Sequence, residues 1–245
     1  MIDEKIFLGY PTSFKDICKI YPPTVNEVVA NDDFYKYQSL FTMSQEELDD
    51  AYRNEDKSIK TPNPFIYLLI NYHAEKEIQS VILQGFEKFL HEPVTIVPEL
   101  EIIVVGVKEE ELDPDVDLVN PRLIKEDNFF EFQNIIRDSM GIQRVEPPDP
   151  DEDPRVARIK AKSRYREKVK AKKNMGPKLG TLLAAICCMG IGLNPLNIGE
   201  MSYADVVWLI EMYQQKESYS TDIRALLAGA DSKKVKPKYW IKNLK

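Results

Sequence analysis

The sequence contains few of the residues that build metal sites or disulfide frameworks. It has three cysteines and two histidines among 245 residues. Cys187 and Cys188 are adjacent, so they lack the CxxC spacing of zinc sites, and no histidine lies near them in the sequence. An odd number of cysteines in apolar surroundings favours reduced, buried thiols in a cytosol. We therefore expect no metal site and no disulfide.

Long apolar runs are also missing. The longest, LGTLLAAICCMGIGL, covers Leu179–Leu193 and includes three glycines. It is shorter than the roughly 20 residues that cross a bilayer, so it predicts a buried helix and no membrane span. The first residues are acidic and lack a continuous apolar core, so we expect no signal peptide. With 43% hydrophobic and 30% charged residues, the composition is typical of a soluble globular protein.

Catalytic motifs are absent as well. The sequence has no HExxH, GxSxG, Walker or GxGxxG pattern. We interpret His73 as a hydrogen-bonded core residue on the apolar face of a helix, and His91 as a helix-end residue. The acidic cluster over 109–117 lacks the glycine and the closing glutamate of a calcium loop. We expect no catalytic residue, no cofactor-binding residue and no metal ligand, and hence a protein that is not an enzyme.

What the sequence does contain is an uneven distribution of charge. Residues 1–153 carry 33 acidic and 14 basic side chains, a charge of −19, whereas residues 154–245 carry 7 and 19, a charge of +12. Together they give the formal net charge of −7. Opposite charges can hold two halves of a chain together, steer a partner or recruit a polyanion, and composition leaves these three possibilities open.

Hydrophobic spacing predicts a mainly helical N-terminal part that contains one β-hairpin. The valine- and isoleucine-rich segment 94–107, interrupted at Pro98, predicts two paired strands, and a further extended piece is predicted near 118–124. Caps and apolar periodicity predict helices in four other places: within 22–41, from Ser44 with Glu47 as its capping box, in the amphipathic segment Phe65–Leu90, and over 128–140 before Gly141.

Composition divides the chain near residue 150. Residues 146–154 hold four prolines and five acids, which predicts a linker after an acidic domain over 1–145. A basic exposed helix is predicted over 155–178, followed by a helical domain with a basic tail over 179–245. In that domain Ser202 is expected to cap one helix, and Ser220 or Thr221 a second that ends at Gly229. The fold class is therefore α+β and predominantly α-helical: an acidic helical domain with a small antiparallel hairpin, then a basic all-helical domain.

The basic segment gives the strongest sequence signal for nucleic acid. Cations in such density can neutralise phosphates, but only Tyr165 is placed to stack on a base, and the pI of about 5.1 opposes attraction to a polyanion. The alternative is a solvated connector whose charge faces acidic protein surface. The basic-helix residues are Arg155, Arg158, Lys160, Lys162, Arg164, Arg166, Lys168, Lys170, Lys172 and Lys173.

Two stretches resemble the tail assembly chaperones of long-tailed bacteriophages. From Ala185 onward, AICCMGIGLNPLNIGEMSYADVVWLIEMY shows a small-residue apolar helix and a loop that leads into MSYADVVWLIEMY. PPTVNEVV and TPNPFIYLLI are similar to the helical first domain of the same family. The resemblance implies a binding protein of the host bacterial cytoplasm that coats the tape measure protein, recruits tail tube subunits, and leaves before the virion is complete.

A chaperone of this kind needs adaptable apolar surface, which methionine and aromatic side chains supply. The candidate partner-binding residues are Met201, Tyr203, Trp208, Met212, Tyr213, Tyr239 and Trp240; the alternative for each is a place in a hydrophobic core. Opposite charges also permit head-to-tail self-association. Two other functions remain open: a nucleic-acid-binding protein that uses residues 155–173, and a structural connector or tail protein of the virion. No contact with a membrane is expected.

Overall fold

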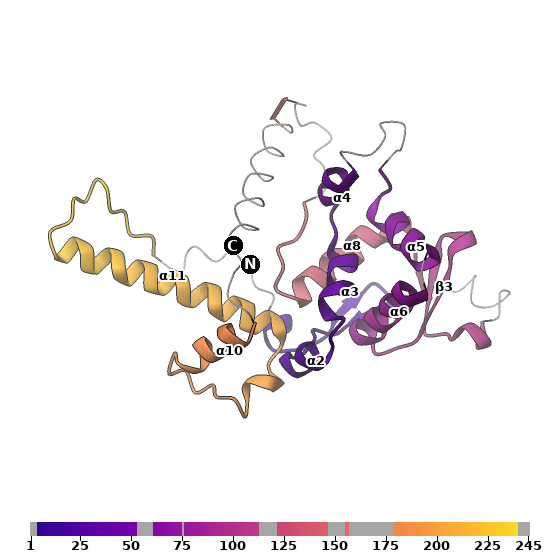
Figure 1. The fold of residues 1–245 in the computed structure, drawn as a ribbon, viewed down its shortest axis with the longest axis horizontal. Helices are drawn as coiled ribbons and strands as arrows, with labels where there is room; N and C mark the ends of the chain where they lie inside the picture. The colour runs from indigo at the N-terminus through magenta and orange to yellow at the C-terminus, as the bar shows by residue number, and fades with distance from the viewer. Residues whose placement is uncertain are drawn as a thin grey trace.

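The computed structural model describes residues 4–52, 61–74, 76–112, 122–146, 155–156 and 179–239. They form a predominantly helical α+β protein with two small antiparallel sheets, which confirms the expected fold class. Helices α2–α6 and α8 and both sheets make up a body, and the long helix α11 projects away from it (Figure 1). The expected linker over 146–154, apart from Glu146, and almost all of the basic helix lie outside the described residues.

The first sheet is a hairpin close to the N-terminus. After helix α1 (Glu4–Phe7), strands β1 (Thr12–Phe14) and β2 (Cys18–Ile20) pair antiparallel with Phe14 opposite Cys18. Phe14 is fully buried and packs against Phe132 at a ring-centroid distance of 5.5 Å. This hairpin was not predicted from the sequence, because strands of three residues are too short to show a clear alternation.

Three short helices follow: α2 (Val25–Ala30), α3 (Phe34–Thr42) and α4 (Gln45–Ala51). The predicted capping box of α4 is confirmed: the Ser44 hydroxyl accepts a hydrogen bond from the Glu47 amide at 3.3 Å, and the Glu47 carboxylate accepts one from the Ser44 amide at 2.9 Å. Thr24 and Glu27 form the same box at the start of α2. Each box satisfies N–H groups that have no partner inside the helix, and so fixes where the chain turns.

The segment predicted as one amphipathic face, 65–90, is two helices packed against each other. They are α5 (Pro64–Ala74) and α6 (Lys76–Leu90), and α6 also packs on α3. Gly85 is the point of closest approach, because a Cβ there would lie 2.5 Å from the Phe41 ring. That ring is fully buried and lies edge-on to Phe86 at 4.7 Å. Phe41 therefore has no room to move aside.

The predicted hairpin is confirmed and belongs to a three-stranded sheet. Strands β3 (Val94–Val97) and β4 (Ile102–Val105) pair antiparallel, with the short 3-10 turn η2 (Pro98–Leu100) between them, and β5 (Leu123–Ile124) pairs with β4. All four residues of β4 are buried, because one face meets the main core and the other a small second cluster. A short 3-10 turn η3 (Glu109–Glu111) follows.

Helix α8 (Glu126–Ser139) runs through the body and closes the main core. It was predicted over 128–140, and Gly141 does follow it with φ +67°, the left-handed conformation that ends many helices. Its aromatic rings join the core: Phe129 lies 5.2 Å from Phe65, and Phe132 lies 6.0 Å from Phe86. The body is therefore held by one continuous cluster of phenylalanine, tyrosine and aliphatic side chains.

The C-terminal part consists of α10 (Leu179–Cys187), the short turn η4 (Ile198–Glu200) and α11 (Tyr203–Leu227). Ser202 caps α11 as predicted, but the expected second helix start at Ser220 or Thr221 was wrong. Serine and threonine are tolerated inside a helix, and α11 runs on to Leu227 just before Gly229, which has φ +95°. Among the described helices, none is long and apolar enough to cross a membrane.

The close contact at Gly85 gives a prediction about stability. Gly85→Ala should lower the free energy of unfolding by about 1–2 kcal/mol, because overpacking against Phe41 exceeds the helix-propensity gain of alanine. Gly180→Ala in α10 is the matched control, since a Cβ there meets no atom within 4 Å, and it should be neutral or stabilising. Urea denaturation measures both. A Gly85→Ala protein as stable as the parent would show that the core can adjust.

Candidate functional site

The starts of α2 and α11 have similar sequences although they are far apart in the chain. TVNEVV begins at Thr24 and SYADVV begins at Ser202. Each has a hydroxyl cap, an acid at the third helical position (Glu27 and Asp205) and two valines after it. The caps are formed in both helices, and Thr24 and Ser202 lie opposite each other as an antiparallel bridge. The two helix starts therefore meet face to face.

Backbone hydrogen bonds join the two starts reciprocally. The amide of Val25 donates to the carbonyl of Met201 at 2.9 Å, and the amide of Tyr203 donates to the carbonyl of Pro23 at 2.8 Å. Val25 and Tyr203 are the first residues of their helices, where an N–H has no acceptor in its own helix. Each segment thus supplies the acceptor that the other one lacks, and α11 is docked on the body by backbone groups.

Two glycines leave room for the docking of this segment on the body. A Cβ on Gly199 would lie 2.1 Å from the Asn26 side-chain oxygen, and the Asn26 amide nitrogen donates to the Glu200 carboxylate at 3.0 Å. On the other side of α11, a Cβ on Gly141 would lie 3.2 Å from the Ala204 Cα. Since φ is also positive at Gly141, a side chain there would be strained as well as crowded.

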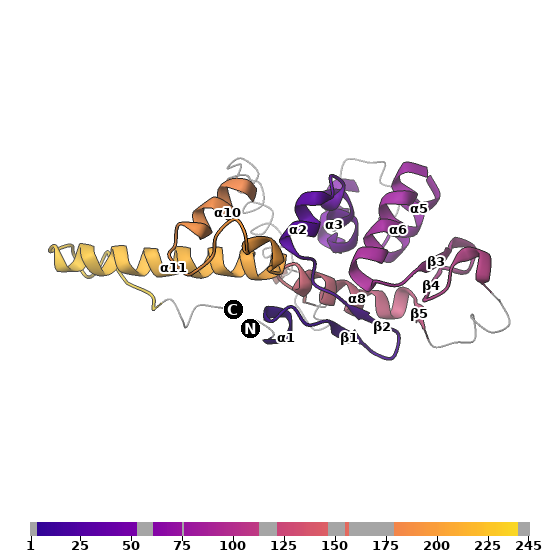
Figure 2. The ribbon, with the colours of Figure 1, turned by 90° about the horizontal axis from the view of Figure 1, so that it is seen from below.

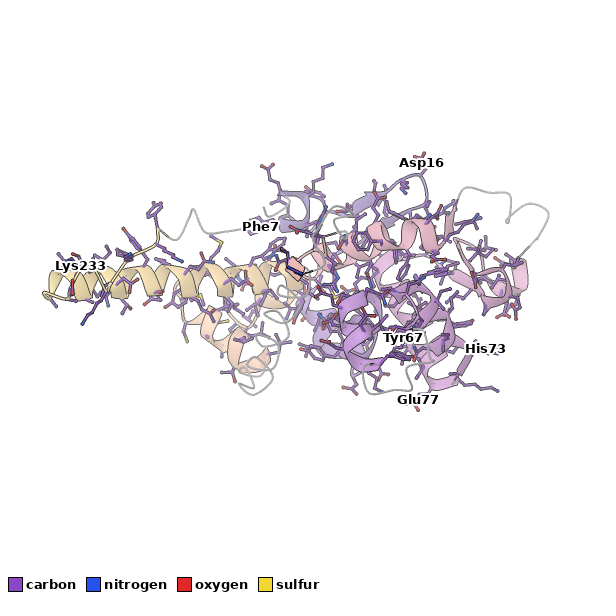
Figure 3. The ribbon with its side chains drawn as sticks, turned by 90° about the horizontal axis from the view of Figure 1, so that it is seen from above. Phe7, Asp16, Tyr67, His73, Glu77 and Lys233 are labelled. Carbon is purple, nitrogen blue, oxygen red and sulfur yellow. The ribbon has the colours of Figure 1, made fainter. Side chains whose placement is uncertain are left out.

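Aromatic rings extend the docking surface on both sides. Tyr203 lies edge-on to Phe34 at 5.5 Å, and burial, with the neighbouring Tyr35 hydroxyl, raises the pKa of Tyr203 to about 12. On the other side Trp208 stacks on Phe7 of α1 at 6.3 Å; Figure 3 shows Phe7 beside the start of α11. The first turns of α11 are therefore fixed to the aromatic core and to the N-terminal helix.

One carboxylate is buried in this interface. Asp205 is 6% exposed, and its Oδ1 has no hydrogen-bond partner among the described residues. Burial raises the pKa of Asp205 to about 6, although hydrogen bonds with Ser202 favour the charged form. The charged side chain therefore costs folding free energy at neutral pH.

Beyond the docking surface, α10 and α11 share only a small core. The loop between them reverses the chain, so that α10 packs against the side of α11 (Figure 2). Four buried side chains hold it together, one of them from α2 in the body: Val25, Ile186, Ile198 and Val206. Ile186 is the only buried residue of α10. We call α10, the loop and α11 the hairpin; beyond its few buried residues, its apolar side chains are half-buried or exposed.

The exposed side of α10 is made of small residues, and the loop carries larger apolar ones. Ile191 is 51% exposed and Leu196 is 94% exposed. The exposed positions of α10 and its end recur at helical spacing: Gly180, Thr181, Ala184, Ala185 and Cys188. Isolated exposed apolar residues are common, but a face that combines them over one helix and its loop is typical of an interaction surface.

The candidate partner-binding residues do not form one surface. Met201 packs on the small core and Tyr203 on the aromatic core, so both serve the docking of α11. Trp208 stacks on Phe7, and Met212 and Tyr213 lie half-buried further along α11. Tyr239 packs edge-on against Tyr219 at 5.6 Å. Trp240 lies outside the described residues.

Of the basic-helix residues, Arg155 alone falls within the described part of the chain, and it is exposed. The rest lie outside it: Arg158, Lys160, Lys162, Arg164, Arg166, Lys168, Lys170, Lys172 and Lys173. His73 is exposed at the surface of the body and is not a core residue (Figure 3); the interpretation was wrong because α5 ends one residue later and its last turn leaves the core. His91, with φ 55°, follows α6 and stacks on Tyr21 at 4.1 Å.

No group of three or more histidine, cysteine, aspartate or glutamate side chains within the described ranges is arranged to hold a metal ion. What sequence reasoning missed is the docking partner of α11. The signal was present, because the hydroxyl–acid–valine–valine pattern occurs at both helix starts. The pattern at Ser202 was interpreted as a local cap and the one at Thr24 was not recognised, and nothing in one chain indicates that two caps pair.

Comparison with known proteins supports a phage origin. Residues 170–245 match the family model described as YomV second domain. YomV is a Bacillus phage protein, and the match identifies this C-terminal segment, which includes the hairpin, as similar to a phage-associated domain. No curated protein and no solved structure matches the chain.

The buried carboxylate predicts a pH-dependent stability. Because the pKa of Asp205 is raised from 3.8 to about 6 in the folded state, the folded protein holds the proton more tightly, and stability should fall as pH rises from about 4 to 6. Asp205→Asn should remove this slope and raise the free energy of unfolding at pH 8 by about 1–2 kcal/mol.

Urea denaturation at pH 5 and pH 8 measures this effect. Glu211→Gln, on the exposed side of the same helix, is the control and should change stability little. An Asp205→Asn protein that is less stable than the parent at pH 8 would show the opposite balance: the carboxylate would then gain more from the helix N-terminus than it loses by burial.

Proposed function

We propose that the protein is a phage tail assembly chaperone that binds the tape measure protein in the host bacterial cytoplasm. The observation that carries the proposal is the hairpin. It is fixed to the body at one end by backbone hydrogen bonds, and beyond its small core it carries exposed apolar side chains such as Ile191 and Leu196. A projecting apolar surface on a rigid base is suited to holding an apolar polypeptide.

The chemistry of the exposed side fits a helical client. Small side chains on α10 let the backbone of another helix approach closely, and the loop residues Ile191 and Leu196 supply apolar area beside them. Binding of an amphipathic helix by an apolar surface needs this combination of close approach and buried area. A client held in this way would keep its apolar faces out of water until assembly.

Two further observations support the proposal. The hairpin lies in the segment that matches a phage-derived family, and the same segment carries the resemblance to tail assembly chaperones. The body, with its excess of acidic side chains, offers a second surface of different character. We propose that it recruits tail tube subunits while the hairpin holds the tape measure protein.

The other two functions make different demands. A nucleic-acid-binding protein would act through residues 155–173, and a structural protein of the virion would use the hairpin permanently. Purification separates these outcomes, because bound nucleic acid that salt removes would favour the first, and presence in finished particles would favour the second.

Co-expression with a tape measure fragment tests the proposal. The parent protein should keep the fragment soluble, and Ile191→Ser with Leu196→Ser should reduce the soluble amount several-fold, because both side chains are exposed and their loss removes apolar contact area. Leu100→Ser is the matched control: Leu100 is 54% exposed but lies in the β-hairpin turn of the body. A double variant that protects the fragment as well as the parent does would overturn the assignment of this surface.

A further inference from the structure

Helix α11 carries a second apolar stripe that its own hairpin does not use. α10 packs on the side of α11 that holds Val206 and Ile210. Another set of side chains recurs at alternating intervals of three and four residues, the spacing of a coiled-coil seam. These residues form what we call the 209–226 stripe: Leu209, Met212, Lys216, Tyr219, Ile223 and Leu226. At 100° per residue, their mean direction lies well over 90° from the side that α10 covers.

The described chain covers this stripe only in part: its five apolar side chains are half-buried, none is fully buried, and Lys216 is exposed. Phe7 stacks on Trp208 near its beginning, and Tyr239 touches Tyr219 near its middle. Buried residues of α11 are confined to Ala204, Asp205 and Val206 in its first turn. Because helices in water owe most of their stability to the packing of an apolar face, a 25-residue helix with this stripe needs a further surface.

We propose that α11 pairs with α11 of a second copy of this chain in antiparallel orientation. The stripe is symmetric about its centre, so antiparallel pairing aligns every layer at once. Leu209 faces Leu226 of the second copy, Met212 faces its Ile223, and Lys216 faces its Tyr219. Because the pair is two-fold symmetric, each of these three contacts occurs a second time with the two copies exchanged. The stripe then buries aliphatic side chains at both ends of a seam about 26 Å long.

The central residues select the antiparallel orientation. In a parallel pair the two Lys216 ammonium groups would share one layer, where like charges repel. In the antiparallel pair each Lys216 lies over the Tyr219 ring of the second copy, which is a favourable cation–π arrangement. Tyr219 exchanges its ring contact with Tyr239 for this one.

The charge of the whole chain favours the same orientation. α11 starts at the acidic body, and the basic tail follows its far end, where Figure 3 places Lys233. Antiparallel pairing brings the tail of one copy beside the body of the other, and keeps the two acidic bodies apart. The tail lysines are Lys233, Lys234, Lys236 and Lys238. A parallel pair would place body beside body and tail beside tail.

Sedimentation of the purified full-length protein, without any client, tests the pairing. The parent should be a dimer at tens of micromolar, and Ile223→Glu should raise the dissociation constant at least tenfold. Gln214→Glu is the matched control on the opposite side of the helix and should remain a dimer. Circular dichroism checks that Ile223→Glu is folded. If it is not, Lys216→Glu at an exposed position should also weaken the dimer, because it removes the cation that lies over the Tyr219 ring of the second copy.

Cysteine cross-linking tests the orientation, in a Cys188→Ser background. A mixture of Leu209→Cys and Leu226→Cys copies should form a disulfide dimer, and neither variant alone should. Raising the salt concentration should weaken the dimer. A monomeric parent, a dimer that none of the stripe variants weakens, or cross-links from single variants would each overturn the proposal. Since no client is present, none of these results depends on whether the protein is a chaperone.

Discussion

The arrangement of this protein depends on an exchange of hydrogen bonds between two helix starts. The first turn of any helix leaves N–H groups without acceptors, and burying them unpaired would cost free energy. Here the amides of Val25 and Tyr203 find their acceptors in each other's segment. The contact therefore solves the same problem for both helices, and neither start can be moved or removed without leaving the other unsatisfied. The position of the hairpin on the body follows from this requirement.

The two sides of that contact are built very differently. The body has a continuous aromatic and aliphatic core in which Phe41, Phe86 and Phe89 interlock. The small core between α10 and α11 consists of four buried side chains, one of which belongs to the body. A unit with so small a core cannot offset the entropy of ordering its residues. Its stability must come from the body, to which it is docked, and from whatever covers the rest of its apolar surface.

The sequence predicted the parts of this structure that local rules determine. Caps at Ser44 and Ser202, the strand pair over 94–107 and the helix before Gly141 all depend on neighbours in the chain, and all are confirmed. The strands at 12–20 were missed because they are too short to show a period. The docking site was missed for a different reason: the pairing of Pro23 and Tyr203 is set by tertiary contacts, which hydrophobic spacing does not encode.

A buried charge at the docking contact is consistent with an interface that has to be specific as well as stable. An apolar residue in place of Asp205 would avoid the cost of burying a carboxylate, but it would lose the hydrogen bonds that the carboxylate accepts from Ser202. A purely apolar patch would also accept other apolar surfaces, which is a hazard on a molecule that exposes as many as this one does. Polar groups that are satisfied in only one arrangement exclude the alternatives. On this argument, the hairpin can leave its apolar faces open to other polypeptides because its attachment to the body relies on backbone hydrogen bonds and capped helix starts.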